Sequence, residues 1–479
     1  MSTEASPSGQ RDGDGGGSGE RAVLITGADL AGRGAGDLLI VGGRIAAVGT
    51  SREVARAAPT EVAVVDASGL VALPGLVDLH THLREPGRED SETIESGSRA
   101  AAMGGYTAVF AMANTSPVTD TAEAAEFVYA TGQRAGYVDV VPVGAVTKGL
   151  AGQELAELGL MARSRANVRV FSDDGKCVHD AQLMRRALEY VKAFDGVVSQ
   201  HAQDPQLAPG TACAHEGELS GRLGLPGWPG VAEESIVARD VMLARHTGSR
   251  VHIAHVSTAG SVEVIRWAKA RGIDVTAEVT PHHLMLTTDL LASYDPVFKV
   301  NPPLRPSEDV AALQAALADG TIDIVATDHA PHVRADKEHA FADAAFGMLG
   351  LEQALSVVST VMVATGAMNW ADVARVMSTT PAMIARLGNQ GQGLAEGAQA
   401  NLTLIDPTAE ISVEAANSQS LSRNNPWHGH RLTGAVHLTM LRGRVTARGG
   451  HDGRHGDDQA APQGEAATTH SHAGKDGLR

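Results

Sequence analysis

The pair His80 and His82 follows an apolar run at residues 76–79, which is itself preceded by Pro74-Gly75. An apolar run bounded by such a turn signal is typical of a buried strand. Side chains two residues apart on a strand point to the same side, so both imidazoles can face one point beyond the strand end. Two histidines placed in this way can bind one metal ion, and the alternative is two buried histidines with ordinary hydrogen bonds. A metal site therefore requires further ligands at the same point.

Further histidines and carboxylates stand at the ends of other apolar runs. They are Asp173 and Asp174 after 167–172, His201 after 197–200, His255 after 251–254, and Asp328 after 324–327. Adjacent strand residues face opposite sides, so only one of Asp173 and Asp174 is expected to face inward. Asp328 alone could instead cap a helix or brace a loop. Burying all of these polar groups without a metal would leave several of them unsatisfied.

The ligand set contains nitrogen and oxygen but no cysteine, which suits Zn²⁺ in a catalytic role. A carboxylate that bridges two ions would allow a two-metal site, with ions about 3.5–4 Å apart. The sequence therefore predicts a metal-dependent hydrolase with one or two Zn²⁺ per chain, and two are favoured.

The elements that must position these residues alternate between strands and helices. Candidate strands are 76–80, 107–112, 138–143, 168–172, 197–201, 251–255, 274–279 and 323–327. Helices such as 92–103 and 121–135 lie between them and end at glycines. This alternation predicts an α/β fold, a (β/α)8 TIM-like barrel with its active site at the C-terminal strand ends. A doubly wound open sheet is the alternative, but no GxGxxG or Walker-type loop follows the first strand.

Both ends of the chain have a different texture. Short strands separated by glycine-rich turns are expected at 22–25, 37–41, 44–48, 62–65, 400–406, 434–441 and 444–445. We expect residues 21–73 and 390–448 to meet in one small β-sandwich domain, beside the barrel of residues 74–389. Residues 1–20 and 449–479 are poor in large apolar residues, so both are expected to be disordered tails.

Composition excludes several classes of protein. The net charge of −17 over 479 residues argues against a nucleic-acid binder, which needs a concentrated basic face. No stretch approaches the ~20 apolar residues of a membrane span, and the N-terminus has no signal-peptide pattern. Cys177 and Cys213 are the only cysteines, which excludes a disulfide framework and fits a cytoplasmic location.

Taken together, these motifs resemble those of the type I dihydroorotases, within the amidohydrolase superfamily. The resemblance covers residues 21–448 and rests on segments 78–87, 171–175, 223–227, 255–258, 299–305 and 326–332. It implies the reversible, zinc-dependent cyclisation of N-carbamoyl-L-aspartate to L-dihydroorotate in pyrimidine biosynthesis. It also implies the metal ligands His80, His82, Asp174, His201, His255 and Asp328. The strand pleat agrees with Asp174, because Val168, Val170, Ser172 and Asp174 share a face.

The resemblance further implies the residues that contact the substrate. They are His82, Arg84, Asn114, Asn301, His332, Phe346 and Gly347, with Asp328 as the catalytic residue that moves the proton. A guanidinium such as Arg84 binds a carboxylate bidentately, which a lysine cannot do. The alternatives are a surface position for Arg84 and turn-forming roles for Asn114 and Asn301. His282, His283, His329 and Cys177 are expected to be structural.

Two other functions remain as alternatives. Hydantoinases, dihydropyrimidinases and allantoinases typically have a carboxylated lysine where Asp174 stands, whereas Lys176 here lies two residues further on. A non-catalytic partner of aspartate carbamoyltransferase would have lost ligands, but all six are present. We expect a homo-oligomer, with aspartate carbamoyltransferase as a possible partner and neither nucleic acid nor membrane. The long loop 202–229 either covers the rim or forms an assembly surface.

Overall fold

The computed structural model describes residues 22–449 of the chain. The tails expected at 1–20 and 449–479 lie, but for Gly449, outside the described residues. Within the described part, no helix is both long and apolar enough to cross a membrane.

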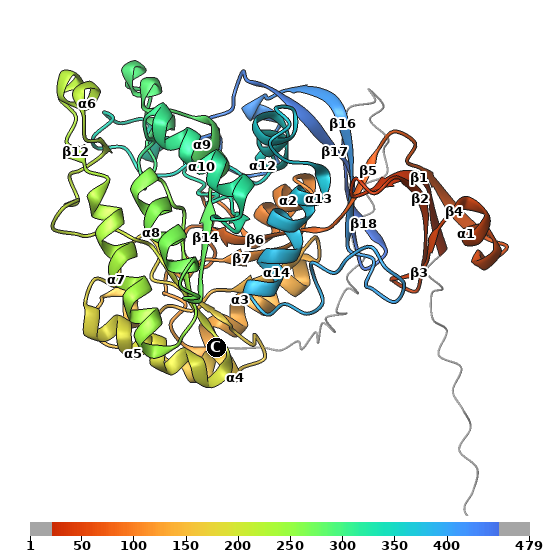
Figure 1. Ribbon diagram of the computed structural model, residues 1–479, viewed down its shortest axis with the longest axis horizontal. Helices are drawn as coiled ribbons and strands as arrows, with labels where there is room; N and C mark the ends of the chain where they lie inside the picture. Colours follow the sequence, from red (N-terminus) through yellow and green to blue (C-terminus); the bar gives the residue numbers. More distant parts are fainter. Residues whose placement is uncertain (1–21, 450–479) are drawn as a thin grey trace, which may run out of the picture. The chain divides into compact units, whose positions relative to one another are not determined.

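Eight parallel strands form the sheets of the larger part of the molecule. They are β6 (Leu76–Thr81), β7 (Tyr106–Ala111), β8 (Asp139–Pro142), β9 (Val170–Phe171), β10 (Val197–Gln200), β13 (Val251–Ile253), β14 (Val275–Val279) and β15 (Ile324–Val325). Figure 1 labels β6, β7 and β14 among them. One sheet runs β6-β7-β8 and another runs β9-β10-β13-β14-β15. Parallel bridges between Gly144 and Phe171 and between Thr81 and His329 join the two sheets at both seams. The parallel pairings therefore lead from β6 through β15 and back to β6. Each strand overlaps one of the eight predicted runs.

Helices connect these strands and cover their outer side, as Figure 1 shows for α5, α7 and α8. The helices of this part are α2 (Ile94–Met103), α3 (Ala122–Ala135), α4 (Leu158–Arg163), α5 (Ala181–Val191), α7 (Val231–Thr247), α8 (Ala259–Lys269), α9 (Pro281–Met285), α10 (Ser307–Asp319), α11 (Arg334–Lys337), α12 (Ala354–Val358), α13 (Trp370–Ala374) and α14 (Thr380–Ile384). Short helical turns occur at Lys148–Leu150, Lys192–Phe194, Thr288–Ser293, Pro296–Phe298, Ser359–Val363, Arg375–Thr379 and Ala415–Asn417. The predicted α3 begins at its cap, where the Thr121 side chain accepts from Ala124 N, and ends at Gly136 with φ 68°.

Alternate residues of the ring strands pack on opposite sides. Val170, Val197 and Ile324 belong to a small apolar cluster inside the ring. Their neighbours Phe171, Val198 and Val325 belong to the larger cluster between strands and helices. This alternation is the two-residue period of a strand, and it fixes which side each residue at a strand end faces.

The two ends of the chain share one eight-stranded sheet. Its strands are β1 (Ala22–Leu30), β2 (Ala35–Val41), β3 (Arg44–Gly49), β4 (Val62–Asp66), β5 (Val71–Pro74), β16 (Leu402–Ser412), β17 (Arg431–Leu441) and β18 (Arg444–Arg448), with helix α1 (Ser51–Ala57) alongside. The sheet order is β18-β17-β16-β5-β1-β2-β3, and β4 pairs with β1. The junction between the ends is the antiparallel pairing of β5 with β16, where Leu73 lies opposite Thr403. Strand β5 was not predicted.

The loop at 202–229 contains some regular structure. Strands β11 (Ala214–His215) and β12 (Gly227–Trp228) form a small parallel pair, with helix α6 (Glu218–Leu223) between them. Arg305 fastens this loop to the larger part, because its Nη1 donates to the carbonyl of Trp228 at 3.1 Å.

Candidate metal centre and adjoining cavity

The six predicted metal ligands all stand at the C-terminal ends of ring strands. His80 and His82 belong to the end of β6, and Asp174 follows β9. The remaining ligands are His201 after β10, His255 after β13 and Asp328 after β15. All six are at most 6% exposed. Parallel strands bring their C-terminal ends to one edge, which explains how residues so distant in the sequence meet.

Asp174 is the residue that the other ligands share. His80, His82, Asp174 and Asp328 form one group of possible ligands, and Asp174, His201 and His255 form a second. Asp174 Oδ1 lies 3.2 Å from His80 Nε2, and its Oδ2 lies 3.3 Å from His82 Nε2. On the other side, Asp174 Oδ1 lies 3.3 Å from His201 Nδ1 and 3.4 Å from His255 Nε2. A carboxylate between two sets of imidazoles is compatible with binding of one or two metal ions.

These residues fit a bound cation by their own chemistry. Within each group, the donor atoms lie within 4.8 Å of one another. His80 Nε2 is buried and has no hydrogen-bond partner among the described residues, which is costly unless another group occupies its lone pair. Burial lowers the pKa of His80, but the charges of Asp174, Glu278 and Asp328 outweigh burial and raise this pKa well above its ordinary value. The site therefore attracts positive charge.

The two carboxylates remain ionised despite their burial. Burial raises the pKa of Asp174, but the charge of His80 and hydrogen bonds from His201 and His255 outweigh it and hold this pKa well below the usual range. Burial likewise raises the pKa of Asp328, yet the charge of His80 and the contact with His82 bring it down to about 2. Ionised carboxylates are available as ligands at neutral pH without first losing a proton.

Asp173 and Asp174 face opposite sides of the chain. Asp173 accepts hydrogen bonds from the backbone nitrogens of Val146 and Thr147, at 2.8 and 2.9 Å, and from the Thr147 hydroxyl. It thereby anchors the loop after β8 and does not belong to either ligand group. Because successive side chains alternate in direction, Asp173 faces the loop after β8, whereas Asp174 faces the other candidate metal ligands.

Glu278 is a site residue that the sequence reasoning missed. Its Oε1 lies 2.6 Å from His80 Nδ1, and its Oε2 lies 3.0 Å from His252 Nε2. A carboxylate on the second imidazole nitrogen fixes the ring orientation and the tautomer of a metal ligand. The signal was present in the sequence, because Glu278 is a lone charge within the otherwise uncharged buried strand β14.

Gln203 is a second residue that was missed, and it connects the metal centre to a cavity. Its Oε1 lies 2.8 Å from His201 Nε2 and accepts from Asn301 Nδ2 at 3.2 Å. Its Nε2 donates to the carbonyl of Ala208, at the start of the loop 202–229. No spacing rule points to Gln203, because its partner Asn301 is 98 residues away in the chain.

Three site residues have a left-handed backbone, with φ of 61° at Arg84, 31° at His255 and 48° at Asp328. Side chains with a Cβ rarely adopt such angles, and residues held in this way cluster at functional sites. At His255 and Asp328 the unusual backbone coincides with the point where a strand ends and its ligand turns inward.

A cavity of ≈ 200 Å³ adjoins the metal centre. Its lining includes the predicted substrate contacts His82, Arg84, Asn114, Asn301, His332, Phe346 and Gly347, together with Asp174, His201 and Asp328. Arg84 is held by its Nε, which donates to the Pro331 carbonyl at 3.0 Å. Burial, followed by the charge of Arg88, lowers the pKa of Arg84 to about 10. Arg84 is therefore still a cation at neutral pH, at the wall of a cavity that can receive an anion.

The remaining polar groups of this cavity offer further hydrogen bonds. Asn114 Oδ1 lies 2.9 Å from His82 Nδ1. Asn301 Oδ1 is buried and has no hydrogen-bond partner among residues 22–449, so it is available to a ligand. Burial and the charge of Arg84 lower the pKa of His332 to about 3, which leaves this imidazole neutral. Its Nε2 lies 2.7 Å from the carbonyl of Phe346.

The residues expected to be structural lie outside the ligand groups. The backbone nitrogen of Gly350 donates to His329 Nδ1, and His283 bonds to Thr280. Burial raises the pKa of the Cys177 thiol to about 12, so it is not a thiolate nucleophile at neutral pH.

Comparisons with known proteins agree with this geometry. A family model described as "Dihydro-orotase-like" matches residues 69–261. The chain is 61% identical to the dihydroorotase of Leifsonia xyli subsp. xyli, over 90% of this chain and 97% of that protein. It is also 61% identical to the dihydroorotase of Streptomyces coelicolor, over 88% of this chain and 98% of that protein. Among solved structures, the L-hydantoinase of Arthrobacter aurescens matches with a TM-score of 0.79 at 26% identity, over 89% of this chain and 96% of that chain.

Proposed function

The chain belongs to the dihydroorotase family, and we propose that it interconverts N-carbamoyl-L-aspartate and L-dihydroorotate in pyrimidine biosynthesis. The enzyme is accordingly a metal-dependent cyclic amide hydrolase. The observation that carries the proposal is the position of Asp174, between two groups of histidines and beside a cavity walled by Arg84. This arrangement supplies a polarising centre for an amide and a cation for a carboxylate, which are the two parts of dihydroorotate.

We propose that two Zn²⁺ ions occupy the centre. His80, His82, Asp174 and Asp328 would hold one ion, and Asp174, His201 and His255 would hold the other. Nitrogen and oxygen ligands without sulfur are compatible with Zn²⁺. When bound, the ions would supply Lewis-acid polarisation of the ring amide and would activate the attacking water.

Asp328 is the residue that we propose to move the proton. Its Oδ1 lies 3.0 Å from His82 Nε2, at the boundary between the ligands and the cavity. In the hydrolytic direction it takes a proton from the attacking water and gives it to the departing ring nitrogen. In ring closure the same carboxylate moves the proton in the opposite direction.

Arg84 is proposed to bind the substrate carboxylate through two parallel hydrogen bonds. Asn114, Asn301 and His332 would orient the ring, with Phe346 and Gly347 along its side. The orphaned Asn301 Oδ1 can accept from a ring N–H, which explains why a buried carbonyl oxygen is left without a partner in the protein.

The finer architecture is part of the proposal. We infer that the ring of eight strands is the barrel of a (β/α)8 domain at residues 74–389. The strands of the eight-stranded sheet would form a β-sandwich domain from residues 21–73 and 390–448. The cyclic order of the parallel pairings supports the barrel, and the pairing of β5 with β16 supports one domain made from both ends of the chain.

The test is to follow the loss of dihydroorotate absorbance on adding purified protein, with the metal content determined on the same sample. We expect turnover with about two zinc ions per chain, and its loss in Asp328→Asn. Hydantoin, dihydrouracil and allantoin serve as comparison substrates, because the L-hydantoinase shares this fold. A metal-loaded protein that hydrolyses one of these and not dihydroorotate would refute the substrate assignment. A protein that stays inactive after zinc is restored would favour a non-catalytic role.

A further inference from the structure

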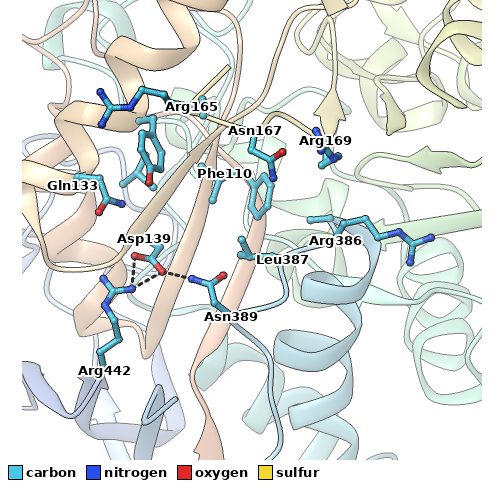
Figure 2. A pocket seen from close by; sticks show the side chains of 15 residues that line it. Phe110, Gln133, Asp139, Arg165, Asn167, Arg169, Arg386, Leu387, Asn389 and Arg442 are labelled. Atoms are coloured by element: carbon cyan, nitrogen blue, oxygen red, sulfur yellow. Dashed lines mark hydrogen bonds and ion pairs between the residues drawn. The ribbon is translucent and has the colours of Figure 1, made fainter. Parts of the chain in front are cut away.

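A second cavity, of ≈ 260 Å³, lies at the opposite ends of the ring strands from the metal centre. Asp139 at the start of β8 and Arg169 directly before β9 form part of its lining, whereas Asp174 follows the other end of β9. Figure 2 shows the side chains around Phe110 and Leu387, with Asp139, Asn167 and Asn389 near them. This cavity shares no lining residue with the cavity beside the metal centre.

The lining of this second cavity is strongly cationic. Arg165, Arg169, Arg386 and Arg442 contribute four guanidinium groups, and Asp139 is the one carboxylate among the lining residues. The whole chain has 56 acidic residues and 39 lysines and arginines. A cluster of four arginines around one acid therefore reverses the charge of the protein locally, and such a concave cationic surface concentrates anions.

Two of these arginines already have carboxylate partners. Arg442 Nη1 lies 2.9 Å from both oxygens of Asp139, and Figure 2 draws this contact. Arg386 Nε lies 2.7 Å from Asp195 Oδ2. The charges of Arg442 and Arg386 are thus largely balanced within the protein.

Arg165 and Arg169 have no carboxylate partner in the described part of the chain. Arg165 is exposed, and its side chain forms no hydrogen bond or ion pair among residues 22–449. Arg169 Nη1 donates to the carbonyls of Ala162 and Val168 at 2.9 Å, which fixes the side chain. The contact with Arg386, followed by the charges of Arg250 and Arg169, lowers the pKa of the Asp195 carboxyl, so Arg169 acts on this carboxylate without direct contact. Arg169 is thus a positioned cation, and Arg165, four residues earlier on the same segment, lies on the other side of Asn167 in Figure 2.

Neutral groups complete the cavity. The amides of Gln133 and Asn167 form no side-chain hydrogen bonds among the described residues, so their donors and acceptors are available to a ligand. Tyr129 and the buried Phe110 provide aromatic surface. Asn167 and Arg386 have left-handed backbones, with φ of 51° and 58°, a feature that accumulates where side chains are held for binding.

We propose that this cavity binds a small organic phosphate of about mononucleotide size. Guanidinium groups match the geometry of a phosphate, and Arg165 and Arg169 offer two that form no side-chain ion pair among the described residues. The cavity is close to the lower limit of about 300 Å³ for small-molecule sites, so it has room for more than a bare phosphate ion. Free amides and aromatic rings suit a planar ring with polar edges. The ligand would contact the segment that begins β9, and Asp174 follows the end of that strand.

The experiment is calorimetric titration of the metal-loaded protein with four probes: inorganic phosphate, uridine, uridine 5′-monophosphate and adenosine 5′-monophosphate. We expect at least one nucleotide to bind with a Kd below about 1 mM, at least tenfold tighter than phosphate or uridine. Arg165→Glu should weaken binding at least tenfold, and Arg165→Lys should restore most of it. Arg52→Glu, an exposed arginine on α1, is the matched control and should leave the Kd unchanged.

A phosphate could also bind at the metal centre, so the titrations are repeated with Arg84→Met and with protein stripped of metal. Binding that persists in both and is lost in Arg165→Glu supports the proposal. Binding that disappears with the metal or with Arg84 places the ligand in the active site and overturns it. Failure of every probe to bind overturns the proposal as well. Equal affinity for inorganic phosphate and for the nucleotides overturns the proposal that the ligand is an organic phosphate. Arg165→Gln provides the test if Arg165→Glu does not fold. None of these outcomes depends on turnover of dihydroorotate.

Discussion

Glu278 Oε1 lies 2.6 Å from Nδ1 of His80, on the opposite side of the imidazole from Asp174. Burial raises the pKa of Glu278, but the charge of His80 and hydrogen bonds from His252 and His80 outweigh it, so this pKa lies below its ordinary value. The carboxylate is therefore ionised and accepts the hydrogen of His80 Nδ1. Nε2 is then the ring nitrogen that would lose its hydrogen when a cation binds at the proposed metal centre.

The first prediction concerns this contact. Glu278→Gln should weaken metal affinity by about 10- to 100-fold, because a neutral amide holds the imidazole less firmly. Competition with a chelator measures the affinity directly, independent of turnover. Glu352→Gln replaces a half-buried carboxylate that is bonded to Ser418 and Gln419, and this change should leave the metal affinity unchanged. Equal metal affinity in Glu278→Gln and the native protein would show that Glu278 only fills space.

The second prediction compares two neighbouring aspartates. Asp174→Asn should lower metal content and reduce kcat/KM by at least about 100-fold, since it removes the shared ligand. Asp173→Asn should retain its metal but lose about 1–3 kcal/mol of stability, because the loop at Val146 and Thr147 loses its acceptor. Metal analysis and urea unfolding of both variants check this. The pleat argument fails if Asp173→Asn is the variant that loses metal.

The third prediction tests carboxylate recognition. Arg84→Lys keeps the positive charge but removes the two parallel N–H donors of the guanidinium group. The value of kcat/KM for dihydroorotate should therefore fall by about 10- to 100-fold. Any residual activity on dihydrouracil, which lacks the carboxylate, should be unaffected. Arg88→Lys is the matched control, because Arg88 lies on the same loop and pairs with Asp336. An equal loss on both substrates would assign Arg84 a structural role.

The fourth prediction concerns pH. The pKa of His332 is about 3 in the folded chain, chiefly through burial, against about 6.5 for an unperturbed histidine. Between these values the unfolded chain binds a proton that the folded chain does not, so the free energy of unfolding falls as pH drops from about 6.5 to about 3. His332→Asn should therefore lose less stability than the native protein between pH 7 and pH 5.

Urea unfolding at both pH values measures this difference. His428→Asn, at an exposed site, controls for the removal of one imidazole. The prediction is contradicted if the native protein and His332→Asn show the same change in the free energy of unfolding between the two pH values.

Much of the site follows from strand periodicity. His80 and His82 are two residues apart, and the even positions from Val168 to Asp174 share a face, so local geometry predicts where these side chains point. Strand β5 could not be predicted in this way. It contains a proline, and it becomes a strand through its pairing with β16, far away in the sequence. Gln203 likewise takes its role from contacts with Ala208, His201 and Asn301 that exist only in the folded chain.

The pairing of β5 with β16 also has a consequence for how the enzyme is made. Strand β5 leads directly into β6, which carries His80, but its partner strand lies about 330 residues further along the chain. At about 5–20 residues per second, the ribosome needs tens of seconds to produce that partner. During this time one edge of β5 has no partner to pair with, and unpaired edges promote aggregation. Folding of the sheet is therefore completed only late in synthesis, and a chain that terminates before β16 would leave this edge open permanently.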